Sequence, residues 1–303
     1  MGSEHFWTSA LYRSSQALDQ GALIPLTTSR LQCPGMGCER FELRQLNAQL
    51  PRHHRPEGPK PNPFSPWEQE LEIESIGNNH VLILNKYPVQ TGHMLLITRQ
   101  WAPQVHWLTD DDWSALVQVD RDTSGLWFFN SGPKAGASQP HRHLQLLRRQ
   151  QGEQVCPRES WFRNLLHDRK SDRSDDTQDP LIASCALALR PHGITLKQEA
   201  RALHALYRSL AETLDLGDVK TEQPPVAPYN LLITPEWMAV IRRKQERASG
   251  FSLNALAFAG YLLATQKSDL DWLKRNGGER LLQEVVDSIS GATDDCQSSM
   301  TTE

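Results

Sequence analysis

Cysteines are few in this chain, and their placement excludes a disulfide-rich fold. Five cysteines lie scattered among 303 residues, and an odd, dispersed set is typical of a reducing compartment. Cys33 and Cys38 are separated by four residues, but no second pair of cysteines follows to complete a zinc site. We therefore expect neither a disulfide framework nor a metal bound at these residues.

Long apolar runs and a strong net charge are also absent. No stretch of about 20 apolar residues occurs, and no basic segment followed by an apolar run opens the chain, so we expect no membrane partner and no secretory leader. The formal net charge of -4 argues against general nucleic-acid binding, although a small basic pocket could still hold one phosphorylated ligand. The expected location is the cytoplasm, and the sequence does not indicate the oligomeric state.

The length and the distribution of polar residues predict two structured parts. The segment 171–180, SDRSDDTQDP, is polar, charged and closed by a proline, which is typical of a linker. It would separate an N-terminal part, residues 1–170, from a C-terminal part, residues 181–290. The tail 291–303 lacks apolar periodicity, and we expect it to be disordered. Each part is large enough to bury a hydrophobic core.

The two parts repeat a similar order of strands and helices without detectable sequence identity. Thr109 and Asp112 resemble a capping box at the start of a helix, and Leu196 begins a long stretch with helical periodicity that reaches Leu214. Short apolar runs between turn residues predict antiparallel strands at 80–84, 94–98, 125–129, 143–147, 185–189, 230–233 and 238–241. The sequence therefore predicts an α+β protein built from two related halves, each with an antiparallel sheet and packed helices.

Polar side chains gather in the segment Pro140–Leu146, PHRHLQL. The two-residue period of a strand places His141, His143 and Gln145 on one face, about 7 Å apart at successive positions, with leucines on the other face. A neutral imidazole is a competent nucleophile near pH 7, and a neighbouring acceptor can fix which ring nitrogen attacks. A bare His-x-His is also typical of surface or metal-binding histidines, so the surrounding residues must decide.

The loop before this strand favours the catalytic interpretation. Ser131–Gln139, SGPKAGASQ, contains small residues whose backbone amides can approach an anion closely, together with the positive charge of Lys134. The same composition is also typical of a flexible connection. A loop of this kind leading directly into a histidine strand predicts a site for a phosphate ester.

These segments carry a resemblance to a known family. The string Asn130–Gln145, NSGPKAGASQPHRHLQ, closely resembles the active-site segment of the ATP adenylyltransferase family, the diadenosine tetraphosphate (Ap4A) phosphorylases, within the histidine triad (HIT) superfamily. Leu84–Val89 and Gly92–Ile97 resemble the nucleotide-binding strand pair of that superfamily. Weaker similarity lies at Asn62-Pro63-Phe64, at Tyr229–Thr234 and at Met238–Arg242, so the resemblance spans roughly residues 40–265.

The resemblance implies a HIT-like fold and a two-step adenylyl transfer. His143 would attack the phosphorus next to adenosine and form an adenylyl-histidine, and inorganic phosphate would then take the adenylyl group, which gives ATP and ADP. His141 would orient the nucleophile, and Gln145 would bind the phosphate or the intermediate. HIT hydrolases carry a third histidine at the position of Gln145, so glutamine favours a transferase.

The resemblance also implies which residues bind the dinucleotide and its phosphates. The family has a substrate-binding lysine before Asn62, a position that Arg52 or Lys60 could fill, and a basic residue after Met238, for which Arg242 and Arg243 compete. The implied substrate-binding residues are Asn85, Lys86, Asn130, Lys134, Gly136, Ala137, Ser138, Gln139, Asn230, Met238 and Arg242. From the residues alone, Asn85 and Lys86 are equally typical of a solvated turn.

Several expectations concern partners and alternative functions. The partners would be a dinucleotide and phosphate, and a divalent cation such as Mg²⁺, which the sequence does not fix, could help to neutralise the polyphosphate. The alternatives are a related nucleotidyltransferase acting on adenylyl sulfate or a nucleotide sugar, and an inactive dinucleotide-binding sensor. We expect Trp101, Trp107 and Trp113 to be core or interface aromatics, and His93 to face outward or to pack locally.

Overall fold

One antiparallel sheet of eight strands forms the centre of the protein. The computed structural model describes residues 4–32, 38–47, 62–170 and 179–287. The strand order is β3-β4-β5-β7-β6-β9-β10-β8, and all neighbours are antiparallel. The strands are β3 (Glu72–Ile76), β4 (His80–Leu84), β5 (Met94–Thr98), β6 (Gly125–Asn130), β7 (His143–Arg148), β8 (Cys185–Leu189), β9 (Tyr229–Ile233) and β10 (Trp237–Arg242).

The strands of the two predicted halves join in this sheet. Strand β6 from the first half pairs with β9 from the second, with Asn130 opposite Asn230 and Trp127 opposite Ile233. The α+β fold and the antiparallel pairing are therefore as predicted, but the halves share one continuous sheet. Isolated strand patterns carry no information on which edges meet, because edge pairing depends on contacts that are distant in sequence.

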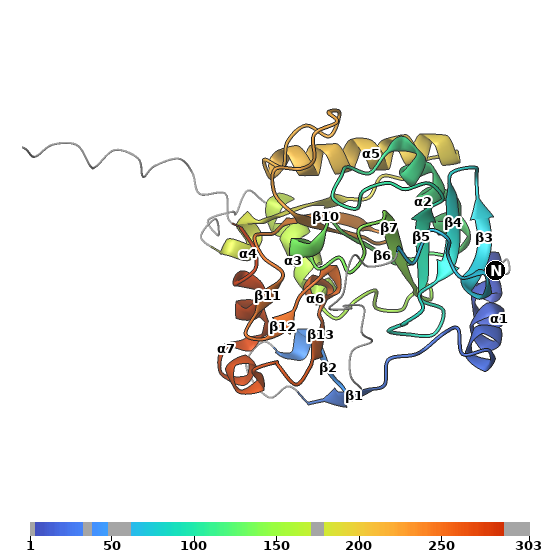
Figure 1. Ribbon diagram of the computed structural model, residues 1–303. Helices are drawn as coiled ribbons and strands as arrows, with labels where there is room; N and C mark the ends of the chain where they lie inside the picture. Colours follow the sequence, from blue (N-terminus) through green and yellow to red (C-terminus); the bar gives the residue numbers. More distant parts are fainter. Residues whose placement is uncertain (1–3, 33–37, 48–61, 171–178, 288–303) are drawn as a thin grey trace, which may run out of the picture.

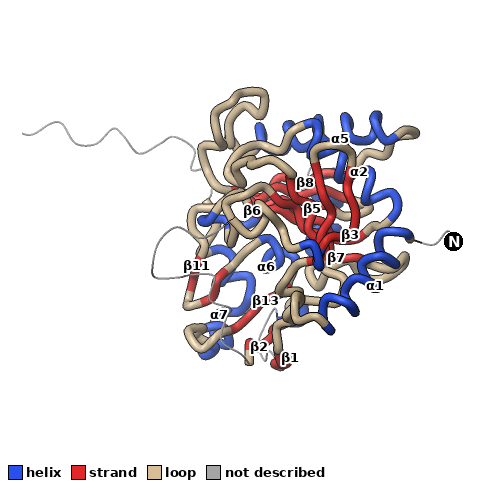
Figure 2. The backbone as a smooth tube through the Cα atoms, turned by 45° about the vertical axis from the view of Figure 1, so that its right-hand side comes forward, coloured by secondary structure: helices blue, strands red, loops and turns tan. Residues whose placement is uncertain are grey.

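Three helices cover one face of the sheet: α1 (His5–Asp19), α2 (Asp110–Asp122) and α5 (Leu196–Thr213). In Figure 1, α5 runs along the top of the picture, and Figure 2 shows α1, α2 and α5 beside the strands. Thr109 and Thr195 each form a capping box at the start of α2 and α5, which satisfies backbone N–H groups of the first turn. Leucines and aromatic rings of these helices pack on the sheet and form its larger apolar core.

The opposite face packs against the end of the first half, from Val155 to Leu165, against the later helices of the second half and against a small sheet. This sheet has the order β1 (Thr28–Leu31), β2 (Glu42–Leu46) and β13 (Tyr261–Ala264), and β13 runs parallel to β2. Phe162 stacks on Trp237 with ring centroids 4.3 Å apart, which anchors α3 on the central sheet. The remaining elements are α3 (Glu159–Lys170), α4 (Pro180–Ala183), α6 (Ala255–Ala259), α7 (Leu270–Gln283), the hairpin β11 (Arg247–Ala248) and β12 (Phe251–Ser252), and the 3₁₀ turns η1 (Cys38–Arg40), η2 (Gln69–Leu71) and η3 (Pro133–Ala135).

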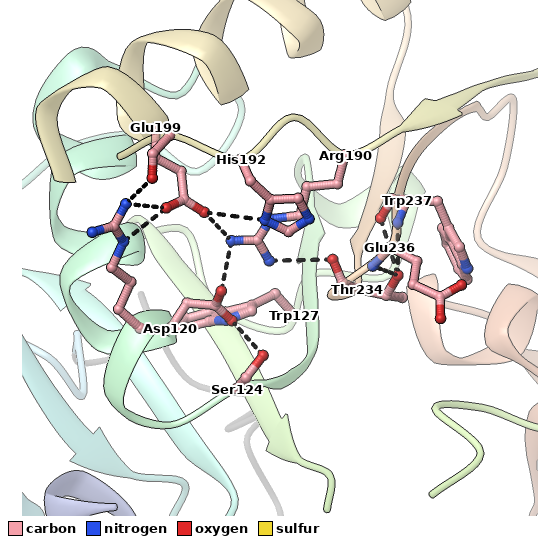
Figure 3. Close-up of polar contacts among 11 residues, drawn as sticks. Asp120, Ser124, Trp127, Arg190, His192, Glu199, Thr234, Glu236 and Trp237 are labelled. Atoms are coloured by element: carbon pink, nitrogen blue, oxygen red, sulfur yellow. Dashed lines mark hydrogen bonds and ion pairs between the residues drawn. The ribbon is translucent and has the colours of Figure 1, made fainter. Parts of the chain in front are cut away.

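A buried charge cluster ties α2 to the second half (Figure 3). The guanidinium of Arg190 donates to Asp120 at 2.6 Å and to Glu199 at 2.9 Å, and it also donates to the carbonyl of Thr234 at 3.2 Å. Trp127 Nε1 donates to the same Asp120 at 2.8 Å. A surface hollow of about 330 Å³ opens on this cluster and does not include His143. Glu199 also pairs with Arg121 at 2.8 Å, whereas Asp120 pairs with Arg190, so the buried charge of Asp120 depends on Arg190 for its balance.

The structure describes little of the predicted linker, 171–180, and none of the predicted tail. Most of the predicted linker, and the tail 291–303, lie outside the described residues. The last two linker residues belong to ordered structure, because Asp179 caps helix α4 with its side chain and Pro180 is the first residue of that helix.

None of the helices in the described part of the chain is both long enough and apolar enough to cross a membrane.

Candidate active site

The candidate nucleophile His143 is the first residue of β7, a strand inside the central sheet between β5 and β6. His143 faces Ile97 of β5 across the strand pair, and Gln145, two residues further along β7, faces Leu95. Because alternate residues of a strand share a face, His143 and Gln145 project to the same side, as predicted. The ring of Phe64 lies 5.4 Å from the His143 ring, so an apolar cluster borders the site.

The hydrogen bond of His143 determines its tautomer. Its Nδ1 lies 2.8 Å from the backbone carbonyl of His141, and since a carbonyl can only accept, Nδ1 must carry the proton. The lone pair of the neutral ring is therefore on Nε2. Burial lowers the pKa of His143 to about 4, because desolvation of the imidazolium outweighs the favourable bond to the carbonyl. His143 is thus a neutral imidazole at physiological pH, with one defined nitrogen able to attack.

His141 lies before strand β7, so the strand row predicted to hold three polar side chains begins at His143 and holds His143 and Gln145. Residues 140–142 pair with the loop before α2 instead: Arg142 N–H donates to the Ala102 carbonyl and Gln104 N–H to the Pro140 carbonyl, both at 2.8 Å. The His141 side chain is fully buried, with Nδ1 2.8 Å from Asn62 Nδ2 and Nε2 2.9 Å from the Thr98 carbonyl. His141 therefore contacts His143 through its backbone carbonyl.

Gln104 fixes the start of β7 and was not found in the sequence. Its Oε1 accepts from His143 N–H at 2.8 Å, and its Nε2 donates to the carbonyls of Asn130 at 2.9 Å and of His143 at 3.2 Å. The buried amide thereby joins the end of β6 to the start of β7. Gln104 lies in an irregular loop with no periodicity, so no sequence pattern indicates this contact.

His93 is a second site residue that the sequence analysis missed. The expectation that it faces outward is wrong, because the side chain is buried and its Nε2 lies 3.1 Å from Gln145 Oε1. Burial, together with the nearby His143, lowers the pKa of His93 to about 3 despite its hydrogen bond to Gln145. Asn85, predicted to hold the nucleotide, is placed behind it, with Nδ2 3.3 Å from His93 Nδ1.

The loop 131–139 is built into the fold rather than being a flexible connection. Gly136 has φ +88°, and a Cβ there would come within 2.6 Å of Asn254 and 2.8 Å of the Leu253 carbonyl, so only glycine fits. Lys134 lies exposed on the turn η3. Gln139 is half-buried, and its Oε1 is buried without a hydrogen-bond partner among the described residues. The loop therefore presents the cation of Lys134 on a fixed backbone, with Ala137 half-buried and Ser138 exposed after it.

Asn130 and Asn230 lie together beneath this loop. Asn230 Nδ2 donates to Asn130 Oδ1 and to the Ala135 carbonyl, both at 2.8 Å, while Asn130 Oδ1 also accepts from Ala255 N–H at 2.9 Å. Arg243 donates to Asn230 Oδ1 and to the Leu253 carbonyl, and burial lowers the pKa of Arg243 to about 9. The Asn130 Oδ1 and both ends of the Asn230 amide thus hold the loop against the second half.

Three predicted substrate-binding residues lie apart from His143. Met238 is buried on the opposite face of the sheet, in the core beneath the helices. Arg242 binds the Leu214 carbonyl at 2.9 Å and Asp287 at 3.1 Å. Lys86 pairs with Glu68 at 2.5 Å on the surface. Of the two basic residues that compete after Met238, Arg243 is therefore the one that contacts the loop network.

The remaining expectations concern basic residues before Asn62, three tryptophans and a metal site. Arg52, Lys60 and Cys33 lie outside the described residues. Trp107 and Trp113 are buried as expected, but Trp101 is 56% exposed, with its ring 5.4 Å from that of His141. Within the described ranges, no three His, Cys, Asp or Glu side chains are grouped so that they could hold a metal ion.

Known proteins resemble this chain in sequence and in fold. The chain is 25% identical over 250 residues, 69% of this chain and 70% of the relative, to diadenosine 5',5'''-P1,P4-tetraphosphate phosphorylase 2 of Saccharomyces cerevisiae. It is 27% identical over 272 residues, 78% of this chain and 77% of the relative, to Protein APA1 of the same yeast. Among solved structures, yeast Ap4A phosphorylase Apa2 shares the fold with a TM-score of 0.68 at 19% identity, covering 94% of this chain and 98% of that one.

Family models match both parts of the chain. The model of the Ap4A phosphorylase N-terminal domain matches residues 1–162, and that of the ATP adenylyltransferase C-terminal domain matches residues 182–287. The first match includes His143 and the whole loop before it, and the second includes Asn230 and Arg243. This chain therefore belongs to the Ap4A phosphorylase family.

Proposed function

We propose that this protein catalyses the phosphorolysis of Ap4A to ATP and ADP through a covalent adenylyl-His143 intermediate. The observation that carries the proposal is the defined tautomer of His143. Its Nδ1–H bond to the His141 carbonyl leaves the Nε2 lone pair available on a buried, neutral ring. Family membership and the S. cerevisiae relative named as an Ap4A phosphorylase support the choice of substrate.

The first step transfers an adenylyl group to the protein. The Nε2 lone pair of His143 attacks the phosphorus next to one adenosine, the N–P bond forms, and the bond from that phosphorus to the bridging oxygen breaks. The bridging oxygen leaves with three phosphates and the second adenosine, as ATP. The ring becomes cationic during attack, and the His141 carbonyl on Nδ1–H stabilises this charge at 2.8 Å.

The second step regenerates the free histidine. An oxygen of inorganic phosphate attacks the adenylyl phosphorus, the N–P bond breaks, and the product is ADP. Gln145 would bind the phosphoryl oxygens through its amide N–H groups, and as an amide it cannot ionise as a third histidine could. We propose that this difference favours transfer to phosphate over transfer to water.

The loop 131–139 would neutralise the polyphosphate. Lys134 supplies a cation on a fixed framework, in which the N–H groups of Gly136 and Ala137 already donate to the Pro133 and Gly132 carbonyls. In this proposal Asn130 and Asn230 act by holding the loop, because their side chains are engaged with Ala135, Ala255 and Arg243. A divalent cation such as Mg²⁺ would bind mainly through the phosphates of the substrate, as Mg²⁺ often does.

Product analysis tests the proposal. The purified protein is given Ap4A with and without inorganic phosphate, and the nucleotides are separated by chromatography. Repeated turnover to equal amounts of ATP and ADP is expected only with phosphate, whereas AMP release in phosphate-free buffer would assign the protein to the hydrolases. Adenylyl sulfate and UDP-glucose serve as comparison substrates, and faster turnover of either one would overturn the choice of Ap4A. Binding of Ap4A without any product would mark a sensor.

A further inference from the structure

Hydrogen bonds connect a backbone N–H to the active site through three side chains, two amides and one imidazole. The Tyr87 N–H lies 3.0 Å from Asn85 Oδ1, Asn85 Nδ2 lies 3.3 Å from His93 Nδ1, and His93 Nε2 lies 3.1 Å from Gln145 Oε1. Asn85 and His93 belong to the turn region between β4 and β5, at the opposite end of β5 from Ile97, the residue that pairs with His143. Gln145, the last of the three, lies on β7, the strand that also carries His143.

The direction of each hydrogen bond follows from the first. A backbone N–H can only donate, so the Asn85 atom that faces it must be the oxygen, and Nδ2 must face His93. An amide NH₂ can only donate, so His93 Nδ1 accepts and the proton of the neutral ring is on Nε2. His93 Nε2–H therefore donates to Gln145, which places Oε1 of Gln145 against His93 and turns its NH₂ away.

The direction of the Gln145 amide matters because the two ends are chemically opposite. An NH₂ group attracts phosphoryl oxygens, whereas an amide oxygen in the same place would repel them. The Gln145 NH₂ makes no hydrogen bond to a described residue, so it is available to a ligand. Either orientation of a free glutamine amide has nearly the same shape, so packing alone would not select one.

We propose that Asn85 and His93 are positioning residues that fix the orientation of the Gln145 amide, so that its N–H groups face the transferred phosphoryl group. This inference rests on the proposed function, because it assigns a role within the same site. His93 acts as a neutral relay of hydrogen-bond direction rather than as an acid or base. Its surroundings favour the neutral ring: His143 faces it from β7 and the apolar Phe128 ring from β6, while the charge of Lys86, next to Asn85, is paired with Glu68.

The substitution Asn85→Asp replaces the amide nitrogen that faces His93 with an oxygen, and this should reverse the direction of the hydrogen bonds through His93. The new carboxylate still accepts from the Tyr87 N–H, so the turn is retained, but it can no longer donate to His93. His93 would instead carry its proton on Nδ1 and present a bare Nε2 to Gln145, whose amide must then rotate. One added proton, on the carboxylate or on the ring, restores the original direction, so the defect should be relieved in acid.

The test combines kinetics with the tautomer of His93. For Asn85→Asp, kcat relative to wild type should fall on the order of 100-fold at pH 8, as when one oriented donor is lost, and should recover as pH falls towards 6. Nitrogen-15 NMR should show the His93 proton on Nε2 in wild type and on Nδ1 in Asn85→Asp at pH 8. Asn276→Asp, the same change on the exposed face of α7, is the matched control and should behave as wild type.

The outcomes separate this inference from the proposed function. A wild-type His93 protonated on Nδ1 would overturn the relay whatever the enzyme does, and so would an Asn85→Asp variant whose relative kcat is unchanged or uniformly low from pH 6 to 8. A wild type that makes no ATP and ADP from Ap4A would overturn the proposed function instead. In that case the NMR result still decides whether Asn85 and His93 orient Gln145.

Discussion

His93 and His143 should make the folded protein lose stability in acid. Both side chains are buried, and burial lowers their pKa values to about 3 and about 4, below the value of about 6.5 in an unfolded chain. Between these values the unfolded chain binds protons that the folded protein excludes. The unfolding free energy is therefore unaffected by these rings above pH 6.5. It falls as the pH drops from 6.5 towards the folded pKa of each ring, and below that pKa no more is lost.

The size of the effect follows from the same values. Lowering the pH from 7 to 5 protonates a histidine of pKa about 6.5 almost completely in the unfolded state, but leaves His93 and His143 largely neutral in the folded state. By linkage this costs about 2 kcal/mol for each ring, or about 4 kcal/mol for the pair. That is a large fraction of the about 5–15 kcal/mol that stabilises an ordinary domain.

Urea unfolding at pH 7 and pH 5 measures the effect. The loss of unfolding free energy between the two pH values should be about 2 kcal/mol smaller in His143→Asn than in wild type, because one excluded proton has been removed. The exposed His167 gives the matched control, and His167→Asn should lose as much as wild type. Equal losses in wild type and His143→Asn would refute the assignment of His143 as a buried neutral ring.

Three further substitutions test the site and its supports. His141→Ala should leave a slower but active enzyme in a turnover assay, because the backbone carbonyl that binds His143 is kept while the anchors to Asn62 and Thr98 are lost; complete inactivity would give the imidazole itself a chemical role. Lys134→Ala should raise KM for Ap4A with little change in kcat, since an exposed point charge contributes to binding in both ground and transition states, and a collapse of kcat at constant KM would contradict this. Arg190→Met should lower the unfolding free energy by about 3–5 kcal/mol in urea titrations, because buried Asp120 loses its ion-pair partner while Glu199 keeps only Arg121, and a near-neutral result would show that water reaches Asp120.

The sequence predicted the elements with strong local signals. The capping box at Thr109 and the apolar face of the helix from Leu196 depend on residues three to four positions apart, and both helices form as expected. The common face of His143 and Gln145 followed from the two-residue period of a strand. The glycines of the loop 131–139 indicated an unusual backbone, and both Gly132 and Gly136 have positive φ.

The features that sequence did not predict depend on distant contacts. His141 lies outside the strand because its neighbours pair with residues 102–104, and Gln104 and His93 reach β7 from 39 and 52 positions away. Asn130 and Asn230 were identified as family residues, but their mutual contact depends on the pairing of β6 with β9. No local pattern contains these contacts, since they are set by which segments the fold brings together.

Identification of the adenylated residue tests the central claim most directly. Wild-type protein mixed with Ap4A in the absence of phosphate should gain the mass of one adenylyl group, and the label should be acid-labile, as expected for an N–P bond. Peptide mapping should place it on His143, and His143→Ala should neither be labelled nor turn over. A label on another residue, or an unlabelled wild type that still produces ATP and ADP, would contradict the covalent mechanism.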